Sequence, residues 1–164
     1  MTGIQIVLRT LHDGERALER ELLAAADRHR VEHEFHHVAR DIARWSHEHA
    51  ERIAHAAEPH DLHLPGPTDQ PEAAPPMATV REPLGRTLGR QPNPGLLLLR
   101  DLRDLHLAAT ENSLSWEMLA QVAQAAGDAE LLDLAAACHP RTLRQLRWTN
   151  TMIKTLSPQL LASL

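Results

Sequence analysis

Apolar residues recur every three to four positions along four stretches of the chain, which is the spacing of α-helices with one buried face. The predicted helices span Ile4–Ala26, Val31–Ala57, Leu96–Ala126 and Ala129–Leu156. Neither glycine nor proline occurs from Glu15 to Glu58 or from Leu96 to Ala126, and most of the chain's 11 prolines lie between these two stretches. Short turns within each pair predict two antiparallel hairpins. An unbroken helix from Ile4 to Ala57 is the alternative for the first pair.

The two predicted hairpins, residues 4–57 and 96–157, are joined by an irregular, proline-rich stretch at residues 58–95. A helix of 25 residues is roughly 40 Å long, and a connection of this length reaches from one end of such a bundle to the other. The second and third helices then run parallel. We therefore expect one all-α, four-helix-bundle domain over residues 1–164. In the last helix, Pro140 predicts a kink or a restart, and Pro158 predicts the end.

Composition narrows the classes of function. Aromatic residues make up 2% of the chain and hydrophobic residues 43%, which indicates a helical Leu/Ala core rather than a strand-rich one. With a net charge of −5 and no long basic run, we expect no nucleic-acid partner. Cys138 is the only cysteine, and neither a signal peptide nor a membrane-spanning segment is evident. We therefore expect a cytoplasmic protein that does not enter a membrane.

The stretch from His29 to His55 is rich in histidine, with most of these residues next to a carboxylate. Only His49 falls on the apolar stripe of its helix, and the others, His29 included, point away from it. We interpret the stretch mainly as a solvent-facing surface. Pairs one turn apart, such as His33 and His37, have the spacing to chelate a divalent ion, but two ligands do not make a specific site.

Several polar residues fall inside the predicted core. Helical phase and hairpin geometry bring one residue of each helix to the same level near mid-bundle: Glu15, His49, Asn112 and Thr142. A buried carboxylate and imidazole are costly unless paired, which leaves two interpretations. In the first interpretation, the four residues form a hydrogen-bonded network that fixes the register of the helices. Alternatively, Glu15 and His49 bind a metal, with Asp41 or His139, within about a turn, as further ligands.

The number of helices, their lengths and the short–long–short order of their connections resemble the ferritin-like superfamily. Its di-iron centre uses a Glu from each of two helices and a Glu-x-x-His from each of the other two. Glu15 or Glu19 could supply the single Glu of one helix. Glu34–His37 has the Glu-x-x-His spacing, although His37 faces outward, and the last helix has no Glu-x-x-His motif. The resemblance implies a bundle whose metal site is lost or altered, with iron or zinc as the candidate cofactor.

The histidine count also resembles hemerythrin-like bundles, whose HxxxH spacing occurs at His33–His37. Two classes of function follow. The first is a small helical protein that binds a metal or small ligand at the mid-bundle polar site. The second is a non-enzymatic scaffold or interaction bundle, with a homodimer as the expected partner. Leu96–Leu99 is a run of four leucines and predicts deep burial or contact with a second copy. No phosphate-binding loop or nucleophile elbow is present, and whether the protein is an enzyme stays open.

Overall fold

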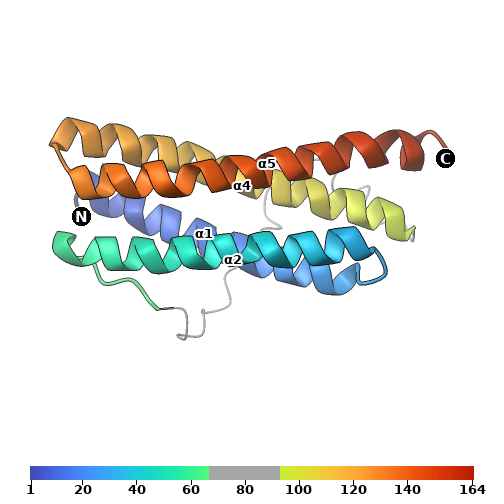
Figure 1. The fold of residues 1–164 in the computed structure, drawn as a ribbon, viewed down its shortest axis with the longest axis horizontal. Coiled ribbons are helices and arrows are strands. Elements are labelled where there is room, and N and C mark those ends of the chain that lie inside the picture. The colour runs from blue at the N-terminus through green and yellow to red at the C-terminus, as the bar shows by residue number, and fades with distance from the viewer. Residues whose placement is uncertain (67–92) are drawn as a thin grey trace.

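The computed structural model describes residues 1–66 and 93–164 and shows four long helices side by side (Figure 1). They are α1 Gly3–Arg28, α2 His33–Ala57, α4 Pro94–Ala126 and α5 Ala129–Leu161, with a 3-10 turn, η1 Glu58–His60, after α2. The described residues contain no strand. The prediction of an all-α four-helix bundle is confirmed. The predicted irregular connection falls largely on residues 67–92, which lie outside the described residues.

The helices form two antiparallel hairpins, α1 with α2 and α4 with α5, and α2 runs parallel to α4 (Figure 1). α1 packs against both α2 and α4, and α5 packs against both α4 and α2. Each helix therefore has two principal neighbours, and the parallel pair α2 and α4 lies on a diagonal of the bundle. A turn separates α1 from α2, so the alternative of one unbroken helix from Ile4 to Ala57 is wrong.

Local capping interactions explain where α1, α4 and α5 begin and where α4 ends. Thr2 and Gln5 form a reciprocal capping box at the start of α1. Asn93 caps α4 and Asp128 caps α5, each through its side-chain oxygen. Gly127 closes α4 with φ of 69°, a left-handed conformation that glycine adopts without steric cost. The observed bounds lie within a few residues of the predicted ones.

The two prolines of α5 do not divide it. The helix continues through Pro140 and Pro158 to Leu161, so the predicted end at Pro158 is wrong. Packing explains the extension, because the side chain of Leu160 lies against the start of α4. A Cβ atom built on Gly95 would lie 2.4 Å from Cδ2 of Leu160. The absence of a side chain at Gly95 lets the last turn of α5 rest on α4.

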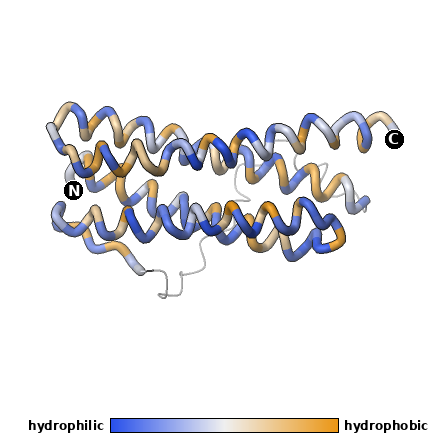
Figure 2. The backbone as a smooth tube through the Cα atoms, in the orientation of Figure 1, coloured by the Kyte–Doolittle hydropathy of each residue, from blue (hydrophilic) through white to orange (hydrophobic). Residues whose placement is uncertain are grey.

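Hydrophobic and hydrophilic residues alternate along every helix (Figure 2), and the buried apolar residues form two clusters. The cluster nearer the N-terminus of α1 includes Leu8, Leu11, Ile53, Trp116 and Leu119. The cluster nearer the turn between α1 and α2 includes Leu18, Leu22, Phe35, Leu102 and Leu105. The core is therefore divided along the bundle axis.

The leucine run at the start of α4 is explained within the chain. Leu96, Leu98 and Leu99 are buried, and Leu98 belongs to the apolar cluster of Leu18, Leu22 and Phe35. This confirms the prediction of deep burial for three of the four leucines. None of the described helices is long and apolar enough to cross a lipid bilayer.

Candidate functional site

Glu15 lies in the centre of the bundle with no exposed surface. Its Oε1 accepts two hydrogen bonds, from Nδ1 of His49 at 3.1 Å and from the indole Nε1 of Trp116 at 2.9 Å. The rings of His49 and Trp116 meet edge to face, with 5.7 Å between their centroids. One carboxylate oxygen is thus held by donors from α2 and α4, which is the kind of pairing that a buried charge requires.

Asn112 enters the same level of the bundle from α4. It lies one turn before Trp116, and its side chain packs against Gly14, the residue that precedes Glu15. Asn112 is 4% exposed, so its amide is removed from solvent. The α1–α4 seam therefore holds a buried amide at the level of Gly14, the residue before Glu15 on α1.

Thr142 enters this level from α5. Gln145, one turn further along α5, donates from Nε2 to the carbonyl of Ile42 at 3.0 Å and to the hydroxyl of Ser46 at 2.9 Å. Ser46 lies one turn before His49 on α2. These contacts bring Thr142, which has no exposed surface, level with His49.

We call Glu15, His49, Asn112 and Thr142 the mid-bundle layer. One polar atom of each has no hydrogen-bond partner among the described residues although it is buried: Glu15 Oε2, His49 Nε2, Asn112 Nδ2 and Thr142 Oγ1. The layer lies between the two apolar clusters, since Glu15 is flanked along α1 by Leu11 and Leu18. The predicted inward positions of all four residues are confirmed.

The structure does not bring Asp41 or His139 to the mid-bundle layer. The side chain of Asp41 is 63% exposed and forms an ion pair with Arg44 on the surface of α2. Nε2 of His139 lies 2.8 Å from the hydroxyl of Ser113, and its Nδ1 lies 3.7 Å from Glu117. His139 therefore belongs to the seam between α4 and α5. The expectation that either residue joins Glu15 and His49 is wrong.

The donor set of the layer does not fit a di-iron centre. Such a centre in a four-helix bundle uses a Glu from each of two helices and a Glu-x-x-His from the other two. The layer supplies one carboxylate and one imidazole. Within residues 1–66 and 93–164, no group of three or more His, Cys, Asp or Glu is placed to hold a metal ion. Protein zinc sites use three or four such ligands, which again exceeds what the layer offers.

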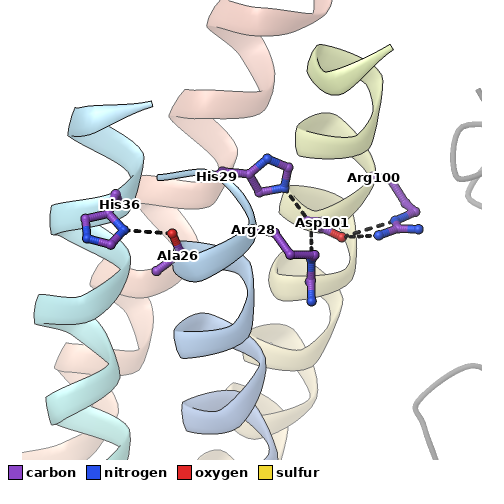
Figure 3. Close-up of polar contacts among 6 residues, drawn as sticks. All are labelled: Ala26, Arg28, His29, His36, Arg100 and Asp101. Atoms are coloured by element: carbon purple, nitrogen blue, oxygen red, sulfur yellow. Dashed lines mark hydrogen bonds and ion pairs between the residues drawn. The ribbon is translucent and has the colours of Figure 1, made fainter. Parts of the chain in front are cut away.

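A second polar cluster ties the turn between α1 and α2 to α4 (Figure 3). Asp101, 4% exposed, accepts hydrogen bonds from Nε2 of His29 at 2.7 Å and Nε of Arg28 at 3.1 Å. Its other oxygen accepts from Nη2 of Arg100 at 2.7 Å. Burial alone would raise the pKa of Asp101. Hydrogen bonds from His29, Arg100 and Arg28 outweigh this effect and lower the pKa to about 2.

The histidine-rich stretch is mostly a surface, apart from His29 and His49, which are buried. His33, His37 and His55 are exposed as predicted. His29 is only 7% exposed, so its predicted outward position is wrong. The reason is that His29 lies in the turn after α1 and not within α2. The helical phase of α2 therefore does not give the direction of its side chain. Figure 3 also shows His36, whose Nδ1 donates to the carbonyl of Ala26 at 2.7 Å.

Trp116 is the member of the site that sequence reasoning missed. Trp116 is fully buried in α4, and its burial alone does not indicate that its indole N–H holds Glu15. A usable signal exists, because a buried indole N–H almost always needs an acceptor. Comparison of the chain with protein-family models, curated proteins and solved structures found no match.

Proposed function

We propose that the chain binds a small polar ligand in the mid-bundle layer, with Glu15 and His49 as its main contacts. The observation that supports the proposal is the set of four buried, unpartnered polar atoms, one on each helix. Leaving one such atom without a hydrogen bond costs about 1–3 kcal/mol. Four of them at one level favour a molecule that bonds to several at once.

The donor and acceptor pattern of the layer defines the chemistry of this ligand. Nδ1 of His49 donates to Glu15, which leaves Nε2 available to a ligand, as an acceptor when the ring is neutral. Oε2 of Glu15 is a second acceptor, Nδ2 of Asn112 is a donor, and the hydroxyl of Thr142 serves as either. A small molecule with N–H or O–H groups and one acceptor, such as a simple amide, complements this pattern. Ordered water is the competing occupant, because one water satisfies two to four polar groups.

Native mass spectrometry of untagged protein, compared with the denatured mass of the same sample, tests the proposal. We expect a stoichiometric added mass in the wild type that is lost in both Glu15→Gln and His49→Gln. Asp41→Asn is the matched control, because Asp41 is a surface residue on α2, and it should keep the added mass. A wild-type mass without any addition contradicts the proposal and leaves water as the occupant. One iron or zinc per chain by elemental analysis, lost in both variants, would instead contradict the proposal of a small polar ligand.

A second candidate function is an interaction module that forms a homodimer. α4 exposes Leu107, Leu114 and Met118 by 47%, 61% and 57%. The spacing of seven and four residues puts all three on one face of α4. Large apolar residues gathered on one exposed face are typical of a protein contact. Sedimentation velocity of the wild type and of Leu114→Glu tests this candidate, and a monomeric wild type across the accessible concentration range contradicts it.

We infer a ferritin-like arrangement as the setting for either function. The parallel course of α2 and α4, and the neighbours of each helix, support it (Figure 1). A cytoplasmic location, expected from the single buried cysteine, is part of the same proposal. Fractionation of the source cells with an antibody against the chain would check this location.

A further inference from the structure

A pocket of about 150 Å³ opens between α1 and α2, outside the mid-bundle layer. Its polar lining consists of His12, Arg16, Glu19, Arg20, His47 and Glu51. No residue of the mid-bundle layer lines it, so the inference below does not depend on the function proposed above. We call this cavity the α1–α2 pocket.

The chain after η1 builds one wall of the α1–α2 pocket. Leu64 is buried in the core, which brings the neighbouring Pro65 over α1. The Pro65 carbonyl accepts from Nε2 of His12 at 3.0 Å and from Nη1 of Arg16 at 3.5 Å. Burial, and next the charge of Arg16, lower the pKa of His12. The His12 ring is therefore neutral near neutral pH, and the charge of the pocket comes from its arginines and glutamates.

These arginines and glutamates give the α1–α2 pocket both signs of charge. Arg16 and Arg20 lie one turn apart on α1. Glu19 accepts from Nδ1 of His47 at 2.8 Å, and Glu51 lies 3.6 Å from Nε2 of the same ring. The two carboxylates thus flank one imidazole where α1 meets α2. A purely anionic ligand is repelled by the glutamates and a purely cationic one by the arginines.

We propose that the α1–α2 pocket binds a free α-amino acid. The ligand carboxylate pairs with the guanidinium group of Arg20, and the ligand ammonium pairs with Glu19 and Glu51. The ligand side chain lies on the apolar part of the lining, which comes from Leu23, Ala50 and Pro65. Liquid water takes about 30 Å³ per molecule, so the pocket has room for roughly five waters. A small or medium amino acid has this size.

Isothermal titration calorimetry with L-alanine, L-serine and L-leucine tests the proposal. We expect saturable binding of at least one of them, with a Kd of about 1 mM or tighter. Two analogues of each separate the charges: the methyl ester has no free carboxylate, and the deaminated acid has no ammonium. Both analogues should bind at least about tenfold more weakly. No saturable binding of any of the three amino acids overturns the proposal, and so does a deaminated acid that binds as tightly as its parent.

Variants locate the binding. Arg20→Gln and Glu51→Gln should each weaken binding at least about tenfold, whereas Arg9→Gln and Glu130→Gln, matched changes at exposed positions, should leave it unchanged. All four positions are outside the core, and a thermal melt of each variant confirms that it is folded. Binding that survives both Arg20→Gln and Glu51→Gln would place the amino acid elsewhere and overturn the proposal. The mass-spectrometric test of the mid-bundle layer is independent of each of these outcomes.

Discussion

The side-chain oxygen of Asn112 occupies the space in which Gly14 would carry a Cβ atom. A Cβ built on Gly14 would lie 2.2 Å from Oδ1 of Asn112, far inside van der Waals contact. Glycine in the interior of a helix costs roughly 0.5–1 kcal/mol relative to alanine. At this position the cost has a packing reason, because the missing side chain lets the Asn112 amide approach α1.

Gly14→Ala should destabilise the protein by about 1–3 kcal/mol, because the added methyl group overpacks the site against a buried side chain. In an Asn112→Ala background the Asn112 amide no longer fills the space beside Gly14. Gly14→Ala should then stabilise the protein by about 0.5–1 kcal/mol, because alanine has the higher helix propensity. Urea unfolding of the four proteins in this double-mutant cycle gives the coupling. An equal effect of Gly14→Ala in both backgrounds would show that the two residues are not in conflict.

Glu15→Ala should cost about 2–5 kcal/mol, because Nδ1 of His49 and Nε1 of Trp116 both lose their acceptor in a dry interior. Glu15→Gln keeps one acceptor oxygen and should cost less. Chemical denaturation measures both values. Glu130→Ala, at an exposed position near the start of α5, is the control and should stay within about 0.5 kcal/mol of the wild type. A Glu15→Ala variant as stable as this control would argue against the observed pairing.

The Asp101 cluster should make stability depend on pH in the acid range. The pKa of Asp101 falls from 3.8 to about 2 on folding, so the unfolded chain binds a proton at Asp101 more readily. The stabilisation is therefore complete above about pH 4 and is lost as the pH falls towards 2. A shift of this size corresponds to on the order of 2 kcal/mol.

Asp101→Asn isolates this contribution. The difference in unfolding free energy between wild type and variant should be largest above pH 4 and should shrink as the pH approaches 2. Urea titrations at fixed pH values between these limits give the curve. A difference that stays constant over this range would mean that Asp101 titrates alike in the folded and unfolded chains.

Cys138 should react slowly with thiol reagents in the folded protein. Burial, the main cause, raises the pKa of the Cys138 thiol to about 11, so little thiolate forms at neutral pH. Alkylation by iodoacetamide, followed by mass spectrometry, should become much faster in urea. The control is Ala137→Cys in a Cys138→Ala background, which places the thiol at an exposed neighbouring position. Equal native rates for the two thiols would contradict the buried assignment.

The fold follows from sequence because residues 15–58 and 96–126 contain neither glycine nor proline, and because the caps of α1, α4 and α5 are local. Pro158 shows the limit of that reasoning. A proline normally ends a helix because it removes a hydrogen bond, but here Leu160 packs against Gly95 far away in the chain. Such a contact between distant segments is not visible in the local pattern of either segment.

The mid-bundle layer was predictable in part, for a related reason. Helical phase places Glu15 and His49 inward, and the structure confirms it. Phase does not give the direction of a side chain at the edge of a stripe, and Asp41 turns to Arg44 on the surface. It also does not apply in a turn, where His29 folds inward to Asp101. The α1–α2 pocket depends on Pro65, whose position over α1 follows from the path of the chain after η1.

The division of the core into two apolar clusters has a consequence for motion. Polar atoms interrupt the dry contacts halfway along every helix, so loosening at one end of the bundle does not have to spread to the other. We therefore expect amide hydrogens near the turn at Gly127 and those near the turn at His29 to exchange as separate groups. A molecule that enters or leaves the middle needs only one half to open, while the other half keeps the helices together.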